Sequence, residues 1–199
     1  MLSSNFISPS VYGALPDIDD TSALPDATLQ ALGHLIVAFN VEQLVGVGLL
    51  HKHFELAQDT IMVHNGHVCK PEPIQSSLST TGTSFFWDGN NFQAFEYGQE
   101  EPLALPNDFL NAFANHLECY QLSSKVALSK LDAKQASGPG KRLLMEHLDF
   151  ATKSHIVEVA PSIQPREATQ WIFEGGFPVV THGCARTSCG QGDYIHKKK

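Results

Sequence analysis

The amino-acid sequence predicts an α+β fold, a mostly antiparallel sheet with two principal amphipathic helices. Two segments, beginning near Asp26 and Asn107, carry apolar residues at helical spacing. Short β-prone runs bounded by Gly, Asn, Pro and Ser follow each of them. Because apolar residues recur every three to four positions in a helix and every two in a strand, the two periods separate these segments. We expect a single domain over residues 25–181, which is an ordinary domain length.

The helices are placed by their start signals. Residues 1–24 mix Ser, Pro, Asp and Gly without a period, so we expect a flexible N-terminal arm there, either disordered or lying along the surface. Asp26 is a candidate N-cap for the first helix, and Pro106-Asn107 begins the second. The apolar stripes are Leu29, Leu32, Leu35, Ile36 and Phe39 in the first helix and Phe109, Leu110, Phe113, Leu117 and Tyr120 in the second.

The strands are placed by alternation and by turn dipeptides. Asn65-Gly66 lies between two β-prone runs, which is the strongest short hairpin signal in a sequence. We therefore predict three antiparallel strands over residues 45–70, the first of them spanning 45–56. A second hairpin is expected over 84–97, turning at 88–91. Further strands are expected at 125–131, 142–160 and 168–174.

The two helices share features that indicate an internal duplication. Each follows an Ala-Leu-Pro tripeptide, and each contains a His-Leu pair, His34-Leu35 in one and His116-Leu117 in the other. The alternative is chance likeness, since amphipathic helices share a period. If the duplication is real, residues 25–103 and 104–181 form two pseudo-symmetric helix-plus-strands halves with a cleft between them, where binding sites often form.

Charge and cysteine content exclude several classes of protein. The 199 residues carry a formal net charge of −8, and neutralising phosphates requires a surplus of Lys and Arg, so we expect binding to neither nucleic acid nor membrane. Four cysteines are too few for a disulfide scaffold, which favours a reducing compartment. The N-terminus lacks signal-peptide features, and no apolar run reaches the roughly 20 residues of a membrane helix. Cytoplasmic or nuclear localisation is the expectation.

The most informative pattern is His51, His53 and Glu55 in the first expected strand. Alternate residues of a strand share a face, so the three side chains should project to one side. Two imidazoles and one carboxylate are the set that binds non-haem iron (Fe), and the set also suits zinc (Zn) or manganese (Mn). The alternative is a half-buried edge whose histidines bond to backbone or water. We predict that His51 and His53 border a cavity.

Two more histidines, His64 and His67, flank the expected Asn65-Gly66 turn. In a hairpin with those two central residues they would be paired across the strands. They complete the first candidate metal site. Further along the chain, His147 could face His155 across a bend, for which we expect a structural role.

The same segment carries two resemblances. The His-x-His pattern, followed by the acidic Asp59 and then Gly66, is similar to the first sequence motif of the cupin family. The run LLHKHF at 49–54 resembles a strand of small uncharacterised proteins from filamentous fungi. Neither resemblance implies an activity for this chain.

We expect residues 182–199 to form a C-terminal tail that contains cysteine and histidine. Two thiolates and two imidazoles can complete a tetrahedral zinc site, so this is the second candidate site. Free thiols and a Cys184–Cys189 disulfide are the alternatives. The candidate ligands are Cys184, Cys189, His182 and His196.

These observations support two hypotheses of function. The first is a small metal-binding protein, in its fullest form a metalloenzyme, whose ion polarises a small-molecule ligand or activates water or dioxygen. The second is a non-catalytic interaction or effector-type protein that binds a protein partner and whose tail holds structural zinc or free thiols. The sequence has no phosphate-binding glycine loop, dinucleotide fingerprint or nucleophile elbow.

Overall fold

Strands dominate the structure, which is a computed structural model describing residues 1–3, 5–131, 143–163 and 168–184. The helical elements are α1 (Pro9–Gly13), α2 (Asp26–Ala38), α3 (Asn107–Cys119) and the single 3₁₀ turns η1 (Ile18–Asp20) and η2 (Ile74–Ser76). The strands are β1 (Val45–Leu49), β2 (Thr60–Asn65), β3 (Val68–Pro73), β4 (Thr81–Trp87), β5 (Phe92–Gly98), β6 (Val126–Lys130), β7 (Leu143–Asp149), β8 (Ser154–Ala160), β9 (Ala168–Glu174) and β10 (Phe177–Cys184).

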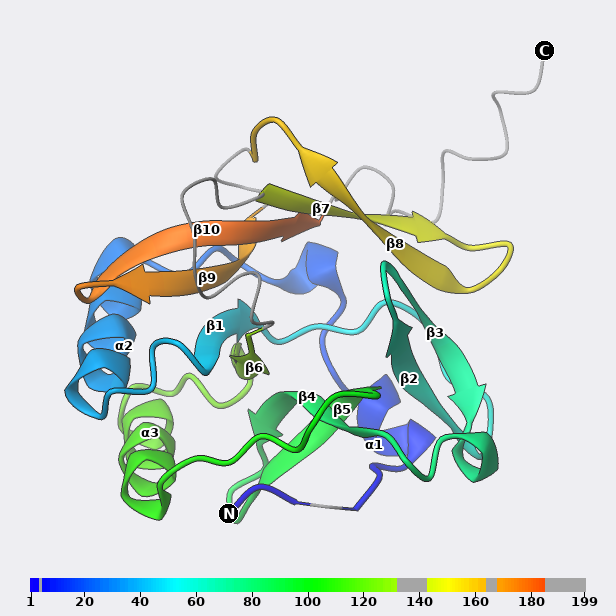
Figure 1. Ribbon diagram of the computed structural model, residues 1–199, viewed down its shortest axis with the longest axis horizontal. Coiled ribbons are helices and arrows are strands. Elements are labelled where there is room, and N and C mark those ends of the chain that lie inside the picture. The colour runs from blue at the N-terminus through cyan, green and yellow to red at the C-terminus, as the bar shows by residue number, and fades with distance from the viewer. Residues whose placement is uncertain (4, 132–142, 164–167, 185–199) are drawn as a thin grey trace.

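The ten strands of the described ranges close into a mixed β-barrel (Figure 1). Their order around the barrel is β1-β6-β4-β5-β2-β3-β8-β7-β10-β9, and β9 pairs with β1 to close it. The pairs β2·β5 and β7·β10 are parallel, and the others are antiparallel. The predicted α+β class is therefore wrong. Both expected helices form, but they lie at one side of the barrel, where α2 contacts α3, β9 and β10.

The predicted hairpin over 61–70 forms, with its turn one residue later than expected. Asn65 pairs with Val68, so the two-residue loop is Gly66-His67. Gly66 has a φ of 63°, as a type II′ turn requires at its first central position. Three strands form within this part of the chain, and β2 and β3 pair antiparallel as predicted. The first strand ends at Leu49 instead of residue 56, and it pairs with β6 and β9 and not with β2.

All five residues of β1 are buried, unlike a strand with one solvated face. The glycines of its Val-Gly-Val-Gly-Leu sequence explain how the neighbouring strand comes so close. A Cβ on Gly46 would lie 2.5 Å from the carbonyl oxygen of Trp171 on β9. Glycine therefore allows β9 to approach β1 and close the barrel.

The order of elements in the first half of the chain recurs in the second. The series α2-β1-β2-β3-β4-β5 corresponds to α3-β6-β7-β8-β9-β10, and the parallel pairs β2·β5 and β7·β10 are equivalent. The strands β1 and β6 pair with each other at the pseudo-symmetry axis, with Val47 opposite Leu128. Val47 also pairs with Trp171 of β9, as Leu128 pairs with Phe85 of β4. The halves as domains and their origin by duplication stay predictions.

Residues 1–3 and 5–24, where an N-terminal arm is expected, contact the barrel at several points. Tyr12 of α1 is completely buried, in an apolar cluster with Leu50 and Phe54. Leu2 forms a β-bridge with Phe92 at the barrel wall. The apolar residues of this segment show no period because they lie in short helical turns and connections, yet five of them are buried: Ile7, Tyr12, Leu15, Ile18 and Leu24.

Candidate metal centre

Seven side chains with metal-binding atoms gather beside the segment that follows β1. They fall into two groups, and within each group one ligand atom per residue lies within 4.8 Å of the others. The first, which we name the His51 group, comprises His51, His53 and Glu146. The second, the Cys69 group, comprises His64, Cys69, Glu96 and His155.

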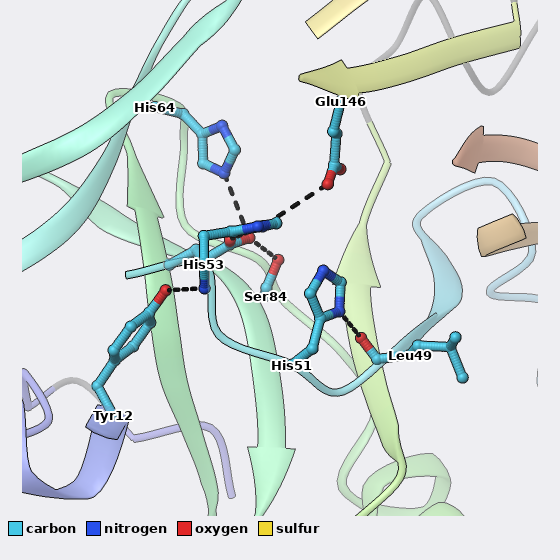
Figure 2. A network of polar contacts seen from close by, with 8 residues as sticks. Tyr12, Leu49, His51, His53, His64, Ser84 and Glu146 are labelled. Atoms are coloured by element: carbon cyan, nitrogen blue, oxygen red, sulfur yellow. Dashed lines mark hydrogen bonds and ion pairs between the residues drawn. The ribbon is translucent and has the colours of Figure 1, made fainter. Parts of the chain in front are cut away.

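His51 and His53 are buried and lie just after β1 rather than on it. The Nδ1 of His51 donates a hydrogen bond to the carbonyl of Leu49 at 2.8 Å (Figure 2). Because a carbonyl only accepts, Nδ1 carries a proton, and in the neutral ring Nε2 then has the lone pair that a metal requires. The two rings are 4.7 Å apart between centroids and almost perpendicular.

The N-terminal segment holds this histidine pair in place. The backbone N–H of His53 donates to the hydroxyl of Tyr12 at 3.2 Å (Figure 2). Lys52, between the two histidines, donates from its backbone N–H to Pro16 and from Nζ to the carbonyl of Gly13. The packed N-terminus therefore fixes the backbone that carries both imidazoles.

Glu55 does not join the histidines, which corrects the expectation from strand alternation. Its side chain is 73% exposed and forms an ion pair with Lys52. Since β1 ends at Leu49, the two-residue period that would align Glu55 with His51 stops before reaching it.

Glu146 of β7 supplies the carboxylate that Glu55 does not. Its Oε2 lies 3.6 Å from Nε2 of His53 (Figure 2), inside ion-pair range but too far for a good hydrogen bond. Burial, reinforced by the charge of Glu96, raises the pKa of Glu146 from 4.5 to about 8. Burial also lowers the pKa of His53 well below 6.5. Near neutral pH, and without a metal, the contact joins two neutral groups.

Glu96 of β5 is the ionised carboxylate of the cluster. Burial opposes its charge, but the hydrogen bonds and positive charge of His64, with the hydroxyl of Ser84, lower its pKa to about 2. Ser84 Oγ donates to Glu96 at 2.8 Å, and His64 Nε2 lies 3.3 Å from the same Oε2 atom. Burial disfavours protonation of His64, yet Cys69 and Glu96 outweigh it and raise the pKa of His64 well above 6.5.

His155 of β8 is the most deeply buried imidazole of the cluster, at 1% exposed. Neither of its ring nitrogens has a hydrogen-bond partner among the described residues. Burial, with the neighbouring His64 and His51, lowers the pKa of His155 well below 6.5, so the ring is neutral. An unsatisfied buried polar group costs about 1–3 kcal/mol, a cost that a bound ion can remove.

A small cavity adjoins the His51 group. Its volume of about 40 Å³ is room for roughly two or three water molecules. His51 and His53 both line it, as predicted, although they do so from outside a strand. The polar residues of the lining are His51, His53, Ser84, Glu96, Ser129, Glu146, Thr169 and Gln170.

The other predicted site residues lie elsewhere or outside the described ranges. His67 is exposed in the turn, and the shifted register pairs His64 with Cys69 in its place. His182 and Cys184 are buried in β10 and so belong to the barrel rather than to a tail. Burial lowers the pKa of His182 to about 4. Cys189 and His196 fall outside the described residues. His147, expected to face His155, is exposed and pairs with Ile156.

The sequence did not identify four members of the two groups as ligands: Cys69, Glu96, Glu146 and His155. Glu96 could have been identified from the sequence, because it is a charged residue in the otherwise largely apolar strand FQAFEYG. The strand SHIVEVA likewise has His155 as its second residue, directly before Ile156 and Val157. No spacing rule connects these strands to His51, so only the fold brings them together.

Comparison of the chain with protein-family models, curated proteins and solved structures found no match. The cupin and fungal resemblances therefore stay predictions. Across the described ranges, the helices are too short or too polar to cross a membrane.

Proposed function

We propose that the protein binds a divalent metal ion through His51, His53 and Glu146 and uses it to act on a small molecule in the adjoining cavity. One observation carries this proposal: two buried imidazoles and a mostly buried carboxylate converge within 4.8 Å on the wall of a cavity. Three protein ligands leave coordination positions for water or substrate, as in catalytic metal sites.

The protonation states of the ligands support this assignment. His53 is neutral because burial lowers its pKa, and its Nδ1 has no hydrogen-bond partner among the described residues. His51 is oriented by its bond to the carbonyl of Leu49, and metal-binding histidines commonly donate their other ring N–H to a carbonyl in this way. A divalent ion would also favour the ionised form of Glu146, whose charge is otherwise suppressed by burial.

Two nitrogen ligands and one oxygen ligand suit Fe(II), Mn(II) or Zn(II). Such an ion supplies Lewis acidity, or activates water or dioxygen. The cavity limits the reacting part of the substrate to a few non-hydrogen atoms. Hydroxyl groups of Ser84, Ser129 and Thr169 line it and can orient a polar ligand by hydrogen bonds.

The test is metal binding by the purified full-length chain, stripped with a chelator and titrated with Zn(II), Mn(II) or anaerobic Fe(II) in a calorimeter. The His51→Ala/His53→Ala double variant should lose the ion that the wild-type protein binds. His67→Ala is the matched control, because it removes an exposed histidine from the nearby turn. Unchanged affinity and stoichiometry in the double variant would contradict the proposal, provided that circular dichroism shows both variants folded.

A further inference from the structure

We propose that the Cys69 group is a second metal site, so that the protein holds two adjacent ions with Glu96 between them. The second site stands on its own residues. The sharing of Glu96 rests on the function proposed above.

Strand register aligns three of the four ligands of this site. His64 of β2 is directly opposite Cys69 of β3, and Cys69 is opposite His155 of β8. Directly opposite residues in neighbouring strands have side chains on the same face, about 5 Å apart. The barrel therefore holds an imidazole, a thiol and a second imidazole in one row, without the use of a flexible loop.

The donor set and its burial favour a closed zinc-type site. Two nitrogens, one sulfur and one carboxylate oxygen make a complete tetrahedral set, and a thiolate selects zinc over magnesium or calcium. Cys69 is fully buried, and neither nitrogen of His155 has a hydrogen-bond partner within the described ranges. The His64 side chain is 30% exposed, which provides a path for the ion to enter.

Glu96 faces both groups of ligands. Its Oε2 lies 3.3 Å from Nε2 of His64, and its Oε1 lies 3.9 Å from Nε2 of His53. The rings of His53 and His155, one from each group, are 4.3 Å apart between centroids. These separations suit a carboxylate shared by two ions about 3.5–4 Å apart, as in two-metal enzymes.

The two sites would differ in access. Glu96 lines the cavity. Within the part of the chain that the structure describes, His64, Cys69 and His155 do not line it. The ion of the Cys69 group would be closed off and retained, while that of the His51 group would exchange ligands with the cavity. The closed ion would also fix Glu96 and His64 beside the open one.

The experiment is a titration of the metal-free, full-length protein with Co(II), followed by absorption. We expect two equivalents to bind and a thiolate-to-cobalt charge-transfer band to accompany one of them. Cys69→Ser should abolish the band and leave one equivalent, and His155→Gln is a second variant at another ligand. His51→Ala should lose one equivalent and keep the band. Cys119→Ser, at an exposed cysteine of α3, is the control and should keep both.

The other outcomes separate this inference from the proposed function. One equivalent without the band, lost in His51→Ala, overturns the second site alone. One equivalent with the band, lost in Cys69→Ser but kept in His51→Ala, supports the Cys69 site and overturns the proposed function. A band that disappears in Cys184→Ser and persists in Cys69→Ser overturns the second site. Folded protein that binds no cobalt overturns both.

Discussion

Oε2 of Glu146 lies 3.6 Å from Nε2 of His53, although the two residues come from opposite halves of the chain. The proposed site therefore takes its ligands from both of the segments whose strand order recurs. His64 and Glu146 also occupy corresponding positions in the two parallel pairs. In β2, which pairs with β5, His64 lies two residues after Met62, the first residue in register. In β7, which pairs with β10, Glu146 lies two residues after Leu144, the first residue in register. An imidazole in one half thus corresponds to a carboxyl group in the other.

Replacement of Glu146 tests this relationship directly. Glu146→Gln should weaken binding of a divalent ion to the His51 group by about 100-fold or more. Loss of an anionic ligand should exceed the roughly 10–100-fold effect of changing a group that only hydrogen-bonds to a ligand. Calorimetric titration measures the change. Glu55→Gln, at the exposed carboxylate once expected to be the ligand, should leave affinity unchanged. A larger loss in Glu55→Gln than in Glu146→Gln would contradict the assignment.

The pH dependence of stability should also depend on Glu146. Its folded pKa of about 8 exceeds the ordinary 4.5, so the folded state binds the proton more tightly than the unfolded state. The stabilisation of the folded state by this proton is fully present below about pH 4.5 and is lost as the pH rises through 8. Glu146→Gln mimics the neutral acid at every pH, so its stability should not depend on this proton. The unfolding free energy of the variant, relative to that of the wild-type protein, should therefore rise by about 2–4 kcal/mol from pH 4.5 to 8.5.

Urea unfolding of both metal-free proteins at pH 4.5 and 8.5 measures this difference. The other ionisable groups are common to both proteins, so the difference isolates Glu146. Parallel dependence of the two unfolding free energies on pH would show that Glu146 is not held neutral. An added divalent ion should stabilise the wild-type protein most at the higher pH.

Tyr12 is predicted to be a positioning residue for His53. Tyr12→Phe removes the hydroxyl that accepts from the backbone N–H of His53 and leaves that buried donor unpaired. We expect a loss of about 1–3 kcal/mol in the free energy of unfolding and weaker metal binding. Tyr120→Phe, at a side chain of which 66% is exposed, should change stability by less than about 0.5 kcal/mol. Equal effects of the two changes in urea unfolding would contradict the role of Tyr12.

Local elements of the fold were predictable from the sequence, and the barrel was not. The apolar period placed α2 and α3 within about a residue of their observed starts, and turn signals located the β2–β3 and β4–β5 hairpins. Closure depends on β1 pairing with β9 and on two parallel pairs. These contacts join distant segments, on which period and turn chemistry give no information.

The residues of the candidate site likewise divide into those that the sequence identified and those that it did not. His51 and His53 were identified by their spacing, and both line the cavity. Glu55 was assigned by alternation beyond Leu49, where the strand has ended. The shift of the turn to Gly66-His67 places His67 in solvent and aligns His64 with Cys69. Glu146 and His155 come from a hairpin that reaches the site only when the barrel closes.

Gly33 tests the packing of α2 against the barrel. Helix propensity alone predicts that Gly33→Ala stabilises the protein by about 1 kcal/mol, since alanine is the better helix former. A Cβ at this position would lie 2.3 Å from a ring carbon of Phe173 on β9 and 2.4 Å from the backbone carbonyl of Gly176. The backbone atom cannot move aside as the end of a flexible side chain could. We therefore expect overpacking to outweigh propensity and to lower the unfolding free energy by about 1–3 kcal/mol.

Gln30→Ala is the matched control, because Gln30 is exposed on the same helix and its replacement should change stability by no more than about 0.5 kcal/mol. Urea unfolding of the two variants beside the wild-type protein gives the comparison. If Gly33→Ala proves more stable than the wild-type protein, α2 does not pack on β9 as closely as the structure has it. If it is destabilised while Gln30→Ala is not, the close approach of α2 to β9 and β10 is what requires glycine. That contact then sets how α2 leads into β1, the strand that delivers His51 and His53 to the site.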